Sequence, residues 1–166
     1  KIDAVLDGGE CGIGCESTLI DLSRTPYRIL RQGALPADEI ADALVDSMKI
    51  IGITGGTGCG KTTALNELER RGALLIDCDA VYHRMLETDR PMLDEIEKYF
   101  PGAVIDGKLD RKALGAVVFT DEEALRDLNI ITHRHINLEI RRILREHAMN
   151  GGTLAAIDAI ELFSSG

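Results

Sequence analysis

The sequence predicts an α/β fold: a three-layer parallel sheet, a helical insert, and a small α+β unit in front of them. Three observations support this prediction. An apolar run at 50–53 leads into a glycine-rich turn and a helical pattern, and 73–77 is a second continuous apolar run. Between 78 and 150 the apolar residues recur at helical spacing, and 153–157 is a third short apolar run. Continuous apolar strands separated by helices are typical of parallel sheets whose two faces are covered.

Residues 1–47 have a different pattern from the rest of the chain. After a glycine-rich stretch, 17–22 and 27–31 read as two strands, and a helix is predicted to begin at Pro36. The apolar face of that helix is expected to contain Ile40, Leu44 and Met48. Two strands and one helix are too small to fold alone, being below about 40 residues. We therefore predict two units, a domain remnant at 1–47 and a second domain at 48–166.

The N-terminal segment resembles the C-terminal end of a YrdC-like L-threonylcarbamoyladenylate synthase domain. The matching stretches are 6–9, 16–21 and 28–33. The resemblance implies contacts with ATP phosphates for Ser17 and Arg31. The main nucleotide motifs of that family have no counterpart here, so we expect a remnant rather than a working synthase.

The stretch from Gly55 to Thr62 fits the phosphate-loop signature G-x-x-x-x-G-K-[ST]. Glycines let the backbone N–H groups turn toward phosphate oxygens without obstruction by side chains. Lys61 is expected to bridge the outer phosphates and Thr62 to ligate Mg²⁺, at the positive end of the following helix. The predicted ATP-binding residues are Gly55, Gly56, Thr57, Gly58, Cys59, Gly60, Lys61, Thr62 and Thr63. The alternative is a chance glycine turn between a strand and a helix.

Two aspartates follow the second strand. They lie in the stretch Asp77-Cys78-Asp79, at the carboxyl end where open α/β sheets place their ligands. A carboxylate at Asp79 could accept or orient the proton of an attacking hydroxyl, acting with Lys61 as the catalytic pair. The alternative role of Asp79 is a helix N-cap, and Asp77 is as well explained by capping a turn. Asp158, at the end of the third strand, is a candidate Mg²⁺ contact through water.

The insert is predicted to be mostly helical. Two amphipathic helices carry the apolar sets Val81, Tyr82, Met85, Leu86 and Met92, Leu93, Ile96, Tyr99, Phe100. A tight turn or small hairpin is expected at 104–109, and Asp110 is expected to cap a short helix. Thr120-Asp121-Glu122-Glu123 reads as a capping box that begins a long helix, which Asn150 and the next glycines end.

Four separate stretches then resemble the dephospho-CoA kinase family. The run 51–62 matches its phosphate-loop sequence, and 75–79 matches its following aspartate motif. The stretch 109–119 and the pair His133-Arg134 match two further motifs. The absence of an N-K-x-D motif argues against a GTPase.

The resemblance covers 49–166 and implies a P-loop nucleoside-kinase-like fold. It implies transfer of the γ-phosphoryl group of ATP, with Mg²⁺, to the ribose 3′-hydroxyl of dephospho-CoA, the last step of coenzyme A synthesis. Asp79 falls on the family's catalytic position, and the helical insert would receive the CoA precursor. Asp77, Arg111 and His133 are the expected substrate contacts, although Arg111 could instead form a first-turn salt bridge.

The chain also departs from the family pattern. Arg134 replaces a proline, so we predict that the long helix runs unbroken. The family continues past residue 166 with a lid whose arginines would stabilise charge on the transferring group. We therefore expect an incomplete kinase fold, and a chain that is a poor catalyst as given.

The net charge of −9 argues against general affinity for nucleic acid or anionic membranes, and no nucleic-acid partner is expected for the kinase part. A polyanionic ligand must then be held by a few local cations. Arg134, Arg141 and Arg145 share one stripe of the long helix and could meet substrate phosphates. The favoured alternative is a solvated face with Glu139 and Glu146.

The cysteine spacing and the length of the apolar runs give only general information about function. The four cysteines show no convincing zinc spacing and are best read as reduced thiols, which predicts a cytoplasmic protein. No apolar run approaches the roughly 18 residues of a membrane span, and the oligomeric state is not determined. Two alternatives to a kinase stay open. One is part of a threonylcarbamoyl-AMP synthase acting in tRNA threonylcarbamoyladenosine formation, and the other is a non-catalytic nucleotide-binding fragment.

Overall fold

The computed structural model describes residues 4, 7–10, 12, 14–56 and 58–158. A small N-terminal unit comes first in the chain. Strands β1 (Leu19–Asp21) and β2 (Arg28–Arg31) pair antiparallel, and helix α1 (Ala37–Asp46) follows them. The two predicted strands and the helix after Pro36 are confirmed, with β1 shorter than expected.

Within the described residues, the main sheet has three parallel strands in the order β3-β7-β4. They are β3 (Lys49–Ile53), β4 (Leu74–Asp77) and β7 (Leu154–Asp158), and helix α2 (Lys61–Arg70) connects the first two. β7, which comes last among the described strands, therefore lies between the other two. The predicted α/β class and parallel sheet are confirmed. No residue of α2 is fully buried in the described structure, although Leu65 and Leu68 are partly buried.

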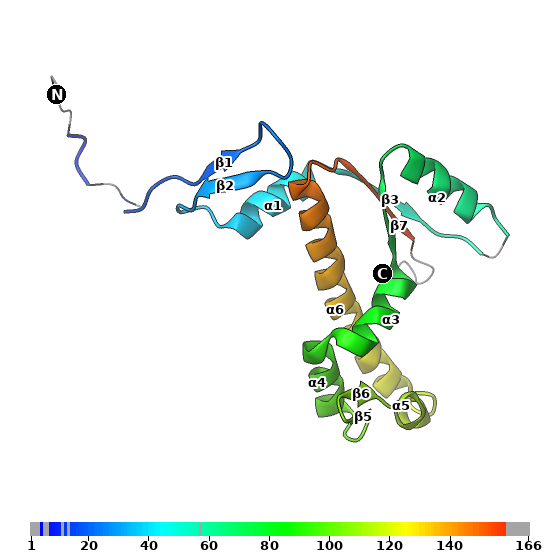
Figure 1. The fold of residues 1–166 in the computed structure, drawn as a ribbon. Coiled ribbons are helices and arrows are strands. Elements are labelled where there is room, and N and C mark those ends of the chain that lie inside the picture. The colour runs from blue at the N-terminus through cyan, green and yellow to red at the C-terminus, as the bar shows by residue number, and fades with distance from the viewer. Residues whose placement is uncertain (1–3, 5–6, 11, 13, 57, 159–166) are drawn as a thin grey trace.

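The helical insert connects β4 to β7 (Figure 1). It contains α3 (Cys78–Thr88), α4 (Arg90–Tyr99), α5 (Arg111–Val118) and the 28-residue α6 (Glu122–Met149). Between α4 and α5, strands β5 (Val104–Ile105) and β6 (Lys108–Leu109) form a hairpin. Its turn has positive φ at Asp106 and Gly107, the pattern of a two-residue type I′ turn. The predicted hairpin is thus present.

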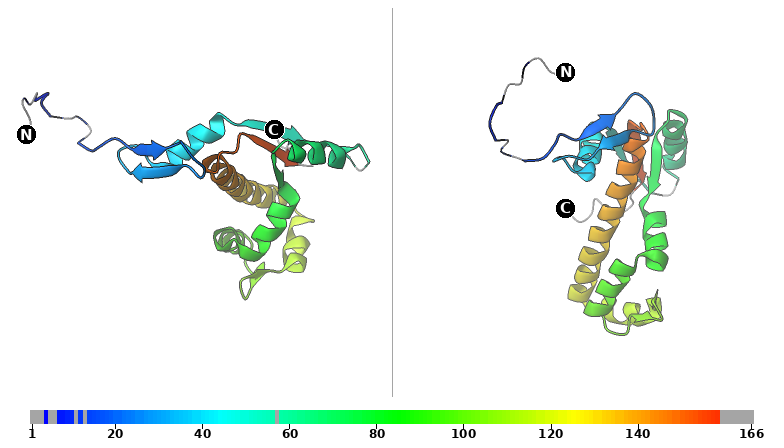
Figure 2. Two further views of the ribbon diagram at one scale, coloured as in Figure 1. Left: turned by 45° about the horizontal axis from the view of Figure 1, so that its top comes forward. Right: turned by 60° about the vertical axis from the view of Figure 1, so that its left-hand side comes forward.

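Helix α6 is the longest described helix and contacts most of the other helices. It packs against α1, α3, α4 and α5, and its C-terminal end leads back to the sheet (Figures 1 and 2). It runs unbroken through His133-Arg134, as the loss of the family proline predicts. No helix in the described parts of the chain is long and apolar enough to cross a membrane.

The N-terminal unit shares the core of the rest. Val45 and Met48 belong to the same buried cluster as residues of α3, α4 and α6. Asp42 of α1 accepts hydrogen bonds from Arg141 and Arg145 of α6. Two arginines that were candidates for substrate phosphates therefore hold α1 in place.

Two local expectations were wrong. Asp121, and not Thr120, is the N-cap of α6, accepting from the N–H groups of Glu123 and Ala124. The Thr120 hydroxyl instead donates back to the carbonyls at the end of α5. Tyr99 is 55% exposed, since α4 turns its buried face to α6 through Met92, Leu93 and Ile96. In α1, Ala41 and Val45 are buried, while Ile40 and Leu44 of the expected apolar face are partly buried and Met48, just after the helix, is buried.

Candidate active site

Three strand ends meet at one edge of the sheet. In the parallel register, Ile53 of β3 lies opposite Asp158 of β7, which lies opposite Asp77 of β4. Because the strands run in the same direction, the loop after β3 and the helix after β4 begin at this edge. It is the carboxyl edge, where open α/β sheets bind their ligands.

The loop between β3 and α2 has the backbone that its glycines predict. Gly58 and Gly60 have φ of 83° and 85°, which side chains disfavour. A Cβ atom on Gly55 would lie 2.5 Å from the sulfur of Cys59. Gly60 is the N-cap of α2, and no side chain in the described structure caps that helix. Its first N–H groups are therefore available to an anion.

The other described residues predicted to bind ATP are exposed to solvent as well. Gly56 is exposed within the loop, and Thr62 and Thr63 are exposed in the first turn of α2. Thr57 lies outside the described residues. The exposed hydroxyl of Thr62 is placed beside Lys61, where a phosphate-bound cation would need a ligand.

Lys61 points to the centre of the sheet edge. Its Nζ donates to Asp158 Oδ1 at 2.8 Å, and the two side chains are 18% and 17% exposed. The hydrogen bond to Asp158 raises the pKa of Lys61, so the ammonium group stays charged. The sequence predicts a water-mediated Mg²⁺ contact for Asp158, but here its contact is Lys61. No cluster of three His, Cys, Asp or Glu side chains in the described structure could hold a metal, and the metal roles of Thr62 and Asp158 stay predictions.

The two aspartates after β4 have different environments. β4 ends at Asp77, which caps α3 by accepting from the N–H of Ala80 at 3.0 Å. Asp79, expected at the strand end, lies in the first turn of α3 and is exposed. No hydrogen bond to the Asp79 carboxylate is found among the described residues, so the alternative role of N-cap belongs to Asp77. Between them, burial raises the pKa of the Cys78 thiol to about 11, so Cys78 stays protonated.

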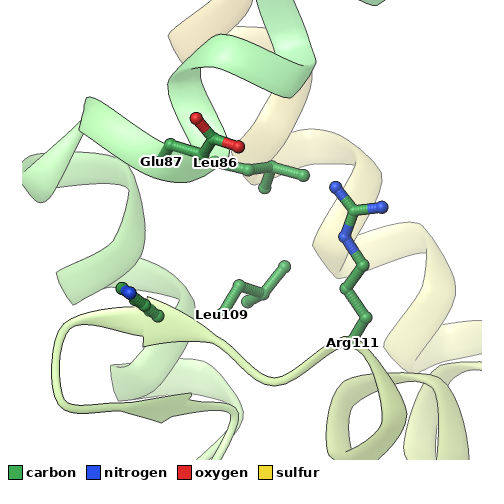
Figure 3. Close-up of a pocket in the computed structure, with 5 residues that line it drawn as sticks. Leu86, Glu87, Leu109 and Arg111 are labelled. Atoms are coloured by element: carbon green, nitrogen blue, oxygen red, sulfur yellow. The ribbon is translucent and has the colours of Figure 1, made fainter.

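Arg111 lines a cavity in the helical insert. The cavity has a volume of about 460 Å³ and lies between α3 and the β6–α5 connection. Figure 3 shows Leu86 and Leu109 pointing toward each other across it, with Arg111 extending along its side. Glu87 and Lys108 complete the lining. Arg111 therefore faces a space that a ligand could occupy.

His83 was not singled out from the sequence, yet it contacts Arg111. The Arg111 Nη2 and His83 Nδ1 atoms are 3.4 Å apart. His83 also lies four residues after Asp79 on α3, which places the two on one face of that helix. This i, i+4 spacing was the available signal. His133 is half-buried on α6 and does not line this cavity.

Ser17 and Arg31 lie together, but far from the phosphate loop. Arg31 Nε donates to the Ser17 carbonyl at 3.0 Å, and Arg31 also pairs with Glu16 at 3.0 Å. Figures 1 and 2 show β1 and β2 on one side of the end of α6 and α2 on the other. The two candidate residues of the N-terminal unit therefore do not join the site at the sheet edge.

Comparison with known proteins places this arrangement in a family. A family model described as dephospho-CoA kinase matches residues 49–158. The dephospho-CoA kinase of Aquifex aeolicus is 38% identical over 72% of this chain and 61% of its own length. That of Anaeromyxobacter dehalogenans is 42% identical over 72% of this chain and 57% of its own length. The chain thus spans about 60% of the length of these curated relatives.

Solved structures agree with this assignment. The crystal structure of TT1252 from Thermus thermophilus is 34% identical, with a TM-score of 0.54 over 72% of this chain and 59% of that one. A dephospho-CoA kinase from Campylobacter jejuni is 26% identical, with a TM-score of 0.53 over 70% of this chain and 59% of its own. The family match covers most of the chain and contains the loop, both aspartates and the insert. The chain belongs to the dephospho-CoA kinase family.

Proposed function

We propose that this protein transfers the γ-phosphoryl group of ATP to the ribose 3′-hydroxyl of dephospho-CoA, giving coenzyme A. The observation that carries the proposal is the common edge of the sheet. There an uncapped helix N-terminus, a charged Lys61 and an exposed Asp79 lie where the insert begins. The proposal concerns the whole enzyme, because the chain spans about 60% of its relatives.

The phosphate loop would hold the donor. The N–H groups at the start of α2 would bind phosphate oxygens, and Lys61 would move from Asp158 to the outer phosphates. The exposed Thr62 hydroxyl and the Asp158 carboxylate fit the oxygen ligands that Mg²⁺ takes, directly or through water. When bound, Mg²⁺ neutralises charge on the phosphates. Lys61 and Asp158 would then separate, each gaining a partner on the donor side.

Asp79 would act on the acceptor hydroxyl. Its carboxylate is exposed in the first turn of α3, near the positive end of that helix, where a negative charge is stabilised. In this position it can orient the 3′-hydroxyl and accept its proton as the bond to phosphorus forms. Asp77 supports this role indirectly, because its cap on Ala80 determines where α3 begins. Asp77 is therefore proposed as a positioning residue rather than a direct substrate contact.

The insert would hold the rest of dephospho-CoA. Arg111 faces the 460 Å³ cavity, and a guanidinium group suits the 5′-diphosphate of the acceptor. Lys108 on the same cavity adds a second cation, whereas Glu87 opposes them. A substrate contact by His133 stays a prediction.

The test is phosphoryl transfer from γ-labelled ATP to dephospho-CoA by the full chain, with slow transfer sufficient. Asp79→Asn is expected to lower the rate constant by about 10²- to 10⁴-fold, since the general base is lost. Asp77→Asn is the matched variant, because asparagine caps a helix as well as aspartate does. It should keep most of the activity.

Three outcomes would count against these assignments. Equal activity of Asp79→Asn and wild type would remove Asp79 from its role. An equally large loss in Asp77→Asn would make Asp77 a substrate contact. Binding of ATP without any transfer would favour the non-catalytic alternative.

The other finer assignments stay predictions. The family match begins at residue 49, so a synthase remnant at 1–47, with its boundary at 47, is supported by resemblance alone. A cytoplasmic location also rests on the sequence.

A further inference from the structure

The β1–β2 hairpin lies at one end of the molecule, away from the helical insert (Figures 1 and 2). Among the described residues, its two strands pair with each other, and neither packs extensively on another helix or strand. A backbone link from the Tyr27 N–H to the Met149 carbonyl, at 2.7 Å, joins the hairpin to the end of α6. A two-stranded sheet is at best marginally stable in water, so this hairpin would gain stability from a further strand.

The hairpin also exposes apolar side chains. Leu19 at the start of β1 is 52% exposed, and Leu22, just after β1, is 54% exposed. Leu30 in β2 is 60% exposed. The hairpin therefore combines exposed leucines with strand edges that no other described strand pairs with, and both are features of a surface that binds another chain.

The two outer edges of the hairpin differ in how open they are to a new strand. β2 begins and ends with an arginine, Arg28 and Arg31, and Leu30 between them is the extra residue of a bulge. Charged side chains and bulges are the features that prevent pairing at an edge strand. β1 has no extra residue and only one charged side chain, Asp21. The edge of β1 is therefore the one that can accept another strand.

A second copy of the chain matches this edge in charge. If two β1 strands pair antiparallel about Ile20, Glu16 of each copy lies opposite Arg24 of the other, and the two-fold symmetry makes this contact twice. The Glu16 and Arg24 side chains are 72% and 74% exposed, so both can reach a partner. The same pairing of two β2 strands would place Arg28 against Arg31 twice, which is repulsive.

The overall charge of the chain also favours contact through the hairpin. The net charge of −9 makes two copies repel each other over most of their surface. Residues 14–35 are different, because they carry three arginines and only two acidic side chains. Two copies therefore approach each other most easily at this unit.

We propose that the protein forms a dimer in which two β1 strands pair antiparallel about Ile20, giving a four-stranded sheet. Main-chain hydrogen bonds between the two strands supply the affinity, and the charged side chains determine the register. Because β1 has only three residues, the contact is small and the expected Kd is on the order of 10 μM. The proposal does not depend on the kinase function, since the hairpin lies far from the phosphate loop (Figure 1).

Analytical ultracentrifugation of the full chain from about 1 to about 200 μM, a range that spans the expected Kd, should show a monomer–dimer equilibrium. Position 19 tests the register, because it lies opposite Asp21 of the other copy but opposite Arg31 within its own hairpin. Leu19→Asp faces a like charge across the interface, so the dimer Kd should rise about 10-fold. Leu19→Lys should keep or tighten the dimer.

The effects of these two variants on folding have the opposite sign. Within one copy, Leu19→Asp gains an opposite charge at Arg31, whereas Leu19→Lys gains a like charge there. Loss of the hairpin fold therefore cannot produce the expected pattern of dimerisation. Leu30→Asp is the matched control, because it makes the same change at an exposed leucine of β2 and should leave the dimer Kd unchanged.

A charge exchange tests the ion pairs between the copies. Arg24→Glu should weaken the dimer, because two glutamates then lie opposite each other, and adding Glu16→Arg should restore it. The double variant disrupts the contacts of Glu16 with Arg31 and of Arg24 with Asp21 within each copy, so restored association would come from the interface alone. Binding of ATP should be unchanged in every variant.

Three results would overturn the proposal. The first is a monomer over the whole concentration range. The second is an equal loss of association in Leu19→Asp and Leu30→Asp, which would place β2 in the interface. The third is slow amide hydrogen exchange in β1 of a monomer, which would show that residues of the same copy cover this edge.

Discussion

The sheet edge and the helical insert differ in how much of each is buried. At the edge, the loop glycines are largely exposed and α2 buries no residue in the described structure. In the insert, Met92, Leu93 and Ile96 are fully buried where α4 packs on α6. A phosphate site needs backbone N–H groups that are open to solvent, whereas an acceptor site needs helices held in fixed positions. The edge therefore depends on local backbone geometry, and the insert depends on packing.

The largest expected effect tests the packing of the insert. Ile96→Ala should lower the free energy of unfolding by about 2–5 kcal/mol, since it leaves a cavity in a fully buried position. Tyr99→Ala on the same helix should change it by about 0.5 kcal/mol or less, because Tyr99 is exposed. Urea unfolding of both variants measures the difference. Similar losses in the two would show that α4 packs differently from the structure.

The next largest effect tests the phosphate edge. Lys61→Ala should weaken ATP binding by about 10- to 100-fold, the loss of one charge-assisted hydrogen bond of roughly 1.5–3 kcal/mol. Its effect on folding should be smaller than that of Ile96→Ala, because the lysine lies outside the core. Calorimetric titration with ATP and urea unfolding give the two quantities.

Asp158→Asn tests whether Asp158, at the same edge, contacts only Lys61 or also the metal. If Asp158 merely holds Lys61 in the empty site, this variant should bind ATP as well as wild type with or without Mg²⁺. If Asp158 contacts the metal, affinity should fall with Mg²⁺ present and stay unchanged after its removal with a chelator. The titration with and without chelator decides between the two roles.

The smallest expected effect concerns the attachment of α1 to α6. Hydrogen bonds from Arg145 and Arg141 hold the pKa of Asp42 well below its usual range. A lowered folded-state pKa stabilises the protein above the unfolded value, about 3.9, and that contribution is lost as pH falls toward the folded value. Asp42→Asn should therefore lower the melting temperature at pH 7 and flatten its decline below about pH 4.

Glu39→Gln is the control for that experiment. Glu39 is an exposed carboxylate of the same helix, so its replacement should leave the pH profile of melting unchanged. A profile of Asp42→Asn that matches wild type would mean that the contacts with Arg141 and Arg145 do not stabilise the folded state.

Features set by neighbouring residues were predicted well. The glycines of the phosphate loop, the Asp110 cap and the turn at Asp106-Gly107 all occur as expected. Long-range partners were not predicted. Lys61 and Asp158 are 97 residues apart, and Asp42 and Arg145 are 103 apart. The wrong prediction at Thr120 also came from a contact with another element. Thr120 and Asp121 could both cap α6, but the Thr120 hydroxyl donates to carbonyls at the end of α5.

By itself, the sequence determined the order of strands and helices, the phosphate loop and the two aspartates that follow β4. These features depend on backbone dihedrals and on hydrogen bonds within a few residues, which residue types specify directly. The tertiary structure decided that Asp77 caps while Asp79 stays exposed, that Lys61 contacts Asp158, and that α1 packs on α6. Such contacts form only when elements far apart in the chain pack together, and the packing is a property of the whole core.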